Sequence, residues 1–263
     1  MFETLKNAFK IKEIRVKIWY TLLFLLIYRV GSYIPIPGIG DKLLDSGALE
    51  SLTYLNIMNM MTGGSLAQGT FFAMGIGPYI NASIIMQLLA VAIPSLERLS
   101  KQGEEGRKRI AQYTRYLTIV LAIIQAVGIL LNYSDMLVAS DNETPLASIL
   151  FGQEWLAYVV VVLFFTAGTV VTMWIGERIT DYGISNGISM LIFAGIIATA
   201  GQTFIQMLGN ITGEEGLTYF WKFVIMLAAL LVVFVCIITV ELAERKIPVQ
   251  YAKQIRGQKM YAV

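Results

Sequence analysis

Long uncharged stretches, each bounded by charged residues, divide the chain. A helix needs about 20 apolar residues to cross the roughly 30 Å hydrocarbon core of a bilayer, because unpaired backbone groups are not tolerated in lipid. The uncharged stretches predict six membrane-spanning helices, near residues 18–34, 71–93, 115–133, 155–175, 184–208 and 220–241. The chain is therefore predicted to be an all-α polytopic membrane protein.

The composition agrees with a membrane protein and argues against most catalytic chemistry. Of the 263 residues, 56% are hydrophobic and 14% are charged, compared with about 25% charged residues in an ordinary soluble domain. The sequence contains no histidine, which is the usual general base and a common metal ligand. Its single cysteine, Cys236, cannot form an internal disulfide. We expect no enzymatic activity, no metal site and no cofactor.

The distribution of Lys and Arg predicts the orientation of the chain. Basic residues close to a span are retained on the cytoplasmic side. They are concentrated in residues 1–17, 98–115 and 242–263, whereas residues 134–154 and 209–218 contain none. Both ends of the chain are therefore predicted to be cytoplasmic, and residues 1–17 are predicted to form an amphipathic segment on the inner membrane surface.

The uncharged segment over residues 51–96 is about twice as long as one span requires. A glycine pair, Gly63–Gly64, interrupts it. We expect a short helix over residues 53–61, a glycine break, and a second helix over residues 71–93 that is kinked at Pro78. The short helix is either a re-entrant piece beside a pore or part of a weakly polar outer loop, and the residues alone leave both possibilities open.

Few charged side chains lie inside the predicted spans. Arg29 is the only charged residue well within one, and its long side chain is expected to reach the headgroups. No Asp or Glu lies near the middle of a span, although proton-coupled transporters usually place an ionisable group there. Several uncharged polar residues within the spans are expected to bond between helices rather than to bind a substrate. Among them are Asn81, Ser83, Gln87, Gln125 and Thr166.

Five sequence motifs follow one another in a characteristic order. They are RVGSYIPIPG at 29–38, GIGPYINASIIMQLL at 75–89, EGRKRIAQYTRY at 105–116, GERIT with GISNGIS within 176–189, and ERKIPVQYA at 244–252. Together they resemble the SecY family, the channel subunits of the bacterial Sec protein-translocation complex.

The resemblance implies a ten-helix clamshell with two pseudo-symmetric halves. Residues 18–208 would form the first half, with helices one to five, and residues 209–241 would form helix six and its outer loop. Residues 242–263 would form part of a cytoplasmic docking loop. Helices seven to ten have no counterpart in this sequence, so we expect it to be a fragment of a longer channel.

The resemblance also implies a pore ring, in which apolar side chains at the waist of an hourglass-shaped pore seal around the translocating chain. This role falls on Ile76, Ile80, Ile188 and Ile192. Each pair is four residues apart and so shares one face of a helix, a spacing that ordinary helix packing also explains. An apolar constriction excludes water and blocks ions.

A plug that closes the channel from outside is implied near residues 58–69. Its central residues are Met60, Met61, Thr62, Gly63, Gly64, Ser65, Leu66 and Ala67. These residues are uncharged and mostly small, which limits how tightly they pack, so displacing the plug is expected to cost a few kcal/mol.

The basic tail resembles the loop on which the motor ATPase SecA and the ribosome dock. The implied docking residues are Arg245, Lys246, Tyr251, Lys253, Arg256 and Lys259. Such side chains suit contacts with phosphates and RNA bases, whereas a positive-inside anchor explains the first two charges equally well. The run 246–252 is expected to lack a returning strand with which to pair.

The function implied by the resemblance is that of the central channel subunit of the Sec translocon. Such a subunit passes unfolded secretory proteins across the bacterial plasma membrane and inserts membrane proteins into it. The implied partners are the SecE and SecG subunits, SecA, the ribosome, signal-sequence-bearing polypeptides and membrane lipid. From the residues alone, a small-solute secondary transporter and a noncatalytic membrane scaffold stay open. The missing mid-membrane carboxylates argue against the transporter, and the basic tail argues against a bare scaffold.

Overall fold

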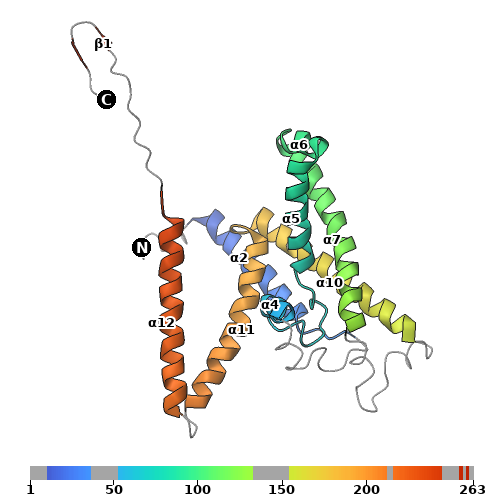
Figure 1. Ribbon diagram of the computed structural model, residues 1–263, viewed down its shortest axis with the longest axis vertical. Coiled ribbons are helices and arrows are strands. Elements are labelled where there is room, and N and C mark those ends of the chain that lie inside the picture. The colour runs from blue at the N-terminus through green and yellow to red at the C-terminus, as the bar shows by residue number, and fades with distance from the viewer. Residues whose placement is uncertain are drawn as a thin grey trace. The chain divides into compact units, whose positions relative to one another are not determined.

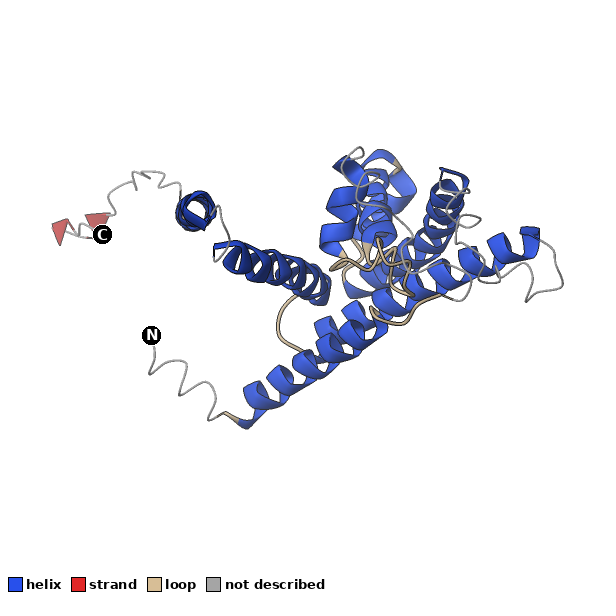
Figure 2. Cartoon of the chain, turned by 90° about the horizontal axis from the view of Figure 1, so that it is seen from below, coloured by secondary structure: helices blue, strands red, loops and turns tan. Residues whose placement is uncertain are grey.

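The computed structural model describes residues 11–36, 53–132, 154–211, 216–244, 255–256 and 259–260, most of them in helices (Figure 2). The chain divides into two compact units, residues 1–202 and 203–263, each of which is described by itself. The all-α prediction is confirmed, apart from one very short hairpin.

Figure 1 labels the described helices in chain order. They are α2 (Lys12–Gly31), α4 (Thr53–Met61), α5 (Gly77–Ala92), α6 (Pro94–Ser100), α7 (Glu104–Asn132), α10 (Glu154–Tyr182), α11 (Gly187–Ile211) and α12 (Gly216–Glu241). The strands β1 (Ile255–Arg256) and β2 (Lys259–Met260) pair antiparallel.

The helices of the described residues provide four clear membrane spans, in α7, α10, α11 and α12. A fifth crossing results if α5 and α6, which meet at 106°, form one broken span. The predicted first span does not qualify, because every stretch of 18 residues in α2 contains at least three charged side chains. The chain is a multi-pass membrane protein, and up to five spans qualify by length and composition within the described residues, against six predicted.

The amino-terminal charges are not set apart from the first apolar helix. Residues 1–10 lie outside the described part of the chain, and α2 begins at Lys12, so Arg15 and Lys17 belong to the same helix as the apolar residues that follow. The predicted separate amphipathic segment therefore does not extend over residues 12–17.

The second predicted span begins later than expected. Residues 71–76 form turns, and α5 starts at Gly77 with Pro78 in its first turn. Proline suits this position because a helix has no use for the N–H group there. The predicted kink at Pro78 is therefore wrong, and the sharp bend lies at Ile93, where Pro94 opens α6.

In the first unit, α7 packs against both α5 and α10, and α10 also packs against α2 (Figure 1). Two hydrophobic clusters form the core. The first consists of Ile36, Leu55, Met58, Leu66, Ala73, Met74, Ala126, Ile129, Leu130, Val161 and Phe165. The second, which we call the ring cluster, has the buried residues Tyr28, Phe72, Ile76, Ile175, Ile179 and Leu191.

The second unit contains the end of α11, all of α12 and the hairpin. The rings of Phe204 and Phe223, with centroids 5.0 Å apart, connect the end of α11 to α12. In the hairpin, Arg256 is the partner of Lys259. The run 246–252, which was expected to be unpaired, lies outside the described residues.

Candidate pore ring and plug

All four isoleucines predicted to form the pore ring belong to the ring cluster or pack against it. Ile76 is buried in it, and Ile80, Ile188 and Ile192 are half-buried and pack against it. The N–H of Ile80 donates to the carbonyl of Ile76 at 3.1 Å, which fixes the first pair one turn apart. Ile76 itself is the N-cap residue of α5. The structure thus brings together two pairs that are about 110 residues apart in sequence.

Gly176 of α10 lets the two pairs approach each other. A Cβ atom at this position would lie 3.4 Å from Cγ1 of Ile188 and 3.7 Å from Cδ1 of Ile76. It would lie 3.3 Å from Cδ1 of Leu191. A larger side chain would push these residues apart, because protein interiors have little free volume. In the sequence, Gly176 stands out only as the first residue of the GERIT motif.

A threonine hydroxyl holds the first turn of α11. Oγ1 of Thr180 accepts a hydrogen bond from the N–H of Gly187 at 2.9 Å and donates to the carbonyl of Gly176 at 2.9 Å. The first N–H groups of a helix have no partner inside the helix, so this acceptor satisfies one of them. Ile188 follows directly and is therefore held in position.

A second threonine, Thr21 of α2, fixes the turn between α10 and α11. Its Oγ1 accepts from the N–H of Ile184 at 3.1 Å and donates to the carbonyl of Lys17 at 2.9 Å. The next residue in the turn, Ser185, has φ 67°, a conformation that few residues other than glycine adopt. Contacts among α2, α10 and the start of α11 thus determine where Ile188 lies.

The plug segment has the predicted order of helix and glycine break. The helix α4 covers residues 53–61, as expected, and turns extend from Thr62 to Gly69. Gly63 and Gly64 have φ 72° and 90°, which glycine adopts without a steric penalty. The pair ends the helix and turns the chain back.

The plug segment is packed more tightly than its small residues suggested. Leu66 is fully buried in the first cluster, and Thr62 and Ser65 are also buried. Oγ of Ser65 donates to the carbonyl of Thr62 at 2.9 Å. The N–H of Ala67 donates to Oδ1 of Asn59 at 2.9 Å, which ties the turn to α4.

The plug segment contacts the backbone on both sides of Ile76. A Cβ atom on Gly75 would lie 2.6 Å from Cγ2 of Thr62, and a Cβ atom on Gly77 would lie 3.3 Å from Cε of Met58. The residues that precede and follow Ile76 therefore have no side chain where the plug segment packs. Ring and plug segment are direct neighbours.

The plug segment also contacts α11 one turn beyond Ile192. A Cβ atom on Gly195 would overlap the carbonyl oxygen of Met61 and would lie 3.2 Å from the N atom of Gly63. Ile192 and Gly195 are three residues apart and so share one face of α11. The same face contributes to the ring and contacts the plug segment.

The expectation that Arg29 reaches the headgroups is wrong. Its guanidinium lies against the plug segment, with Cζ 3.4 Å from the position that a Cβ atom on Gly63 would occupy. Nη1 is buried and has no hydrogen-bond partner among the described residues. The Cζ atom is 5.8 Å from the ring centroid of Tyr33. A positive charge therefore lies beside the plug segment.

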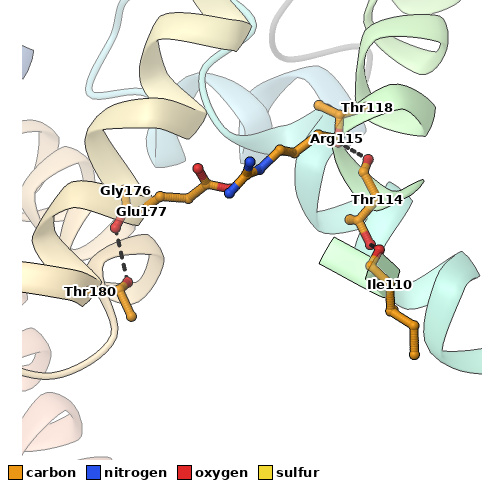
Figure 3. A network of polar contacts seen from close by, with 7 residues as sticks. All are labelled: Ile110, Thr114, Arg115, Thr118, Gly176, Glu177 and Thr180. Atoms are coloured by element: carbon orange, nitrogen blue, oxygen red, sulfur yellow. Dashed lines mark hydrogen bonds and ion pairs between the residues drawn. The ribbon is translucent and has the colours of Figure 1, made fainter. Parts of the chain in front are cut away.

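An ion pair joins α7 to α10 near the ring cluster (Figure 3). Nε of Arg115 donates to Oε1 of Glu177 at 2.7 Å. Glu177 follows Gly176, so the pair ties α7 to the part of α10 that contacts Ile76 and Ile188. The two side chains are 46% and 24% exposed, and a pair as accessible as this contributes about 1 kcal/mol or less.

The predicted docking residues are only partly described. Arg245, Lys246, Tyr251 and Lys253 lie outside the described residues, whereas Arg256 and Lys259 pair in the hairpin. Their docking role stays a prediction.

The site offers a cluster of apolar side chains rather than reacting groups. Within the described ranges, no three His, Cys, Asp or Glu side chains are grouped so that they could hold a metal ion. Isoleucine side chains form no hydrogen bonds, so water and ions enter a ring of them only at a desolvation cost. The residues build an apolar cluster with a glycine-broken segment packed beside it.

Comparison with known proteins identifies the family. The SecY family model matches residues 70–262. The chain belongs to the SecY family. Protein translocase subunit SecY of Bacillus licheniformis is 40% identical over 257 residues, covering 96% of this chain and 57% of that protein. The Streptomyces galbus subunit is 41% identical over 272 residues, covering 99% of this chain and 60% of that protein. The chain thus spans less than two thirds of the length of these relatives.

Two solved structures share the fold. One, a protein-conducting channel, has a TM-score of 0.50 at 22% identity and covers 86% of this chain and 46% of that one. The other, Sec61 in the canine ribosome–channel complex from the endoplasmic reticulum, has a TM-score of 0.56 at 21% identity, with coverages of 93% and 54%. The predicted family is confirmed, and a small-solute transporter is not favoured.

Proposed function

We propose that the chain forms the amino-terminal part of a protein-conducting channel, which passes unfolded secretory proteins across the plasma membrane and membrane proteins into it. Membership of the SecY family supports this function. The observation that carries it is the meeting of the two isoleucine pairs in one cluster, with the plug segment packed on both sides of Ile76.

In this proposal the ring seals the resting channel and the plug segment supports the seal. Apolar side chains present no groups to solvate ions, and they make no directional bonds, so the ring reshapes around any passing sequence. Moving the plug segment away from Gly75 and Gly77 would free the backbone beside Ile76 and let the ring widen. The chain itself catalyses no reaction and takes its energy from a partner.

The proposed partners are the SecE and SecG subunits, the SecA motor, the ribosome, signal-sequence-bearing polypeptides and membrane lipid. One structure that shares the fold is a ribosome–channel complex, which favours a ribosome contact for this chain. SecA and the ribosome would dock on the basic tail, and both ends of the chain would then be cytoplasmic. The docking residues would be Arg245, Lys246, Tyr251, Lys253, Arg256 and Lys259.

Site-specific crosslinking to a stalled secretory polypeptide tests the proposal. Single cysteines replace Ile80, Ile192 or, as a control, the 62% exposed Leu163 of α10, in the full-length channel with Cys236→Ser. Crosslinks are expected at Ile80→Cys and Ile192→Cys, because a chain in the pore touches the ring, and not at Leu163→Cys. Equal crosslinking at all three positions, or none at the ring positions, would contradict a polypeptide pathway through the ring.

A further inference from the structure

Arg29 is a partly buried cation that the pore ring does not use. It is the only charged residue between Lys17 and Asp41, and its buried Nη1 has no hydrogen-bond partner among the described residues. A charge removed from water is costly unless nearby groups compensate it. The aromatic face of Tyr33, 5.8 Å from Cζ, supplies part of the compensation.

The carboxyl ends of two helices supply the remaining compensation for the charge of Arg29. Arg29 lies in the last turn of α2, which ends at Gly31. Its guanidinium contacts Gly63, two residues beyond Met61, where α4 ends. The last carbonyls of a helix carry partial negative charge and attract a cation within about one turn. One arginine therefore stabilises the carboxyl ends of both helices.

Gly63 has no space for a side chain beside Arg29. A Cβ atom on Gly63 would overlap Nη1 of Arg29 and would lie 3.3 Å from Cα of Gly195. The backbone of Gly63 thus lies close to both the guanidinium from α2 and the backbone of α11. Movement of the plug segment out of this contact separates the end of α4 from the charge of Arg29.

We propose that Arg29 is a positioning residue that latches the plug segment in its closed place by attraction to the carboxyl end of α4. The inference rests on the proposed function, in which the plug segment must leave the ring. The latch is reversible, because an opened plug lets water reach the guanidinium, and the regained hydration offsets the lost attraction. The latch requires a positive charge at this point and not merely a long side chain.

Thiol labelling of the plug segment tests the latch. Ser65 is 1% exposed in the turn, and Ser65→Cys in the intact chain with Cys236→Ser provides a reporter for a membrane-impermeant maleimide added from outside. Arg29→Met removes the charge and keeps a long side chain, whereas Arg29→Lys keeps the charge. We expect labelling about three- to thirtyfold faster in Arg29→Met, the change that a charge at a partly buried helix end produces, and within about twofold of the parent in Arg29→Lys.

A second reporter separates plug release from general unfolding. Thr118→Cys on α7 replaces a fully buried residue and is expected to stay unlabelled in both Arg29 variants. The proposal is overturned if Arg29→Met labels no faster than the parent, if Arg29→Lys labels as fast as Arg29→Met, or if Thr118→Cys becomes labelled together with Ser65→Cys. Labelling needs no transported substrate. A chain that shows the latch but no crosslink to a stalled polypeptide would refute the channel function alone.

Discussion

The ring isoleucines and the plug segment come close because the backbone opposite them carries no side chains. Gly176 leaves room for Ile76 and Ile188, and Gly195 leaves room for the carbonyl of Met61. An added Cβ atom would overlap Met61 at Gly195 and would be in tight contact with Leu191 at Gly176. The positions of the isoleucines are therefore determined as much by glycines on α10 and α11 as by the isoleucines themselves.

The hydroxyl of Thr180 is expected to stabilise the ring through the start of α11. Thr180→Val keeps the shape of the side chain but leaves the N–H of Gly187 without its acceptor. We expect a loss of about 1 kcal/mol in the free energy of unfolding, because this bond is only partly buried. Thr180→Ser retains the hydroxyl and serves as the matched control.

Thermal unfolding of the purified chain in detergent measures the difference. Thr180→Val should unfold at a lower temperature than the parent, with Thr180→Ser close to the parent. Equal unfolding temperatures for Thr180→Val and Thr180→Ser would show that the hydroxyl does not hold the turn.

At the scale of elements, short sequence signals predicted those helix ends that depend only on neighbouring residues. The bounds of α4 followed from the glycine pair after Met61, because left-handed glycines end helices wherever they occur. The kink predicted at Pro78 is wrong, because proline is compatible both with a kink inside a helix and with the first turn of a helix. The turns over residues 71–76 show that Pro78 lies in a first turn.

Contacts between distant elements could not be predicted from spacing. The interval of four residues puts each isoleucine pair on one helix face, but it does not show that both pairs pack with the same cluster. The resemblance to the SecY family supplied that pairing. The site of Arg29 against Gly63 depends on α2, α4 and α11 together, and its only sequence signal was an isolated charge in an apolar stretch.

At the scale of the whole molecule, the number of spans depends on α2. By composition, α2 contains too many charged residues to count as a span, yet the guanidinium of Arg29 packs against Gly63 within the protein. Arg15 and Lys17 lie towards its amino-terminal end, where cytoplasmic headgroups would solvate them. We therefore expect α2 to cross the membrane.

Thiol accessibility in intact cells tests this crossing. With Cys236→Ser as the background, cysteines replace Ile11 and Ile34, which are 51% and 52% exposed at the two ends of α2. Ile34→Cys should react with an impermeant reagent added outside, and Ile11→Cys only after the membrane is permeabilised. Reaction of both from one side would contradict a membrane crossing by α2.

The central claim is that the four isoleucines form a seal that excludes water. The most direct measurement is the ion conductance of the resting full-length channel in a planar bilayer, with Ile80→Asn and Ile192→Asn compared with Ile80→Leu and Ile192→Leu. A polar side chain wets the constriction, and a barrier lowered by about 1.4 kcal/mol raises the rate of passage roughly tenfold. We predict at least this increase for both Asn variants and none for the Leu variants. Unchanged conductance in both Asn variants would show that these isoleucines only pack helices together.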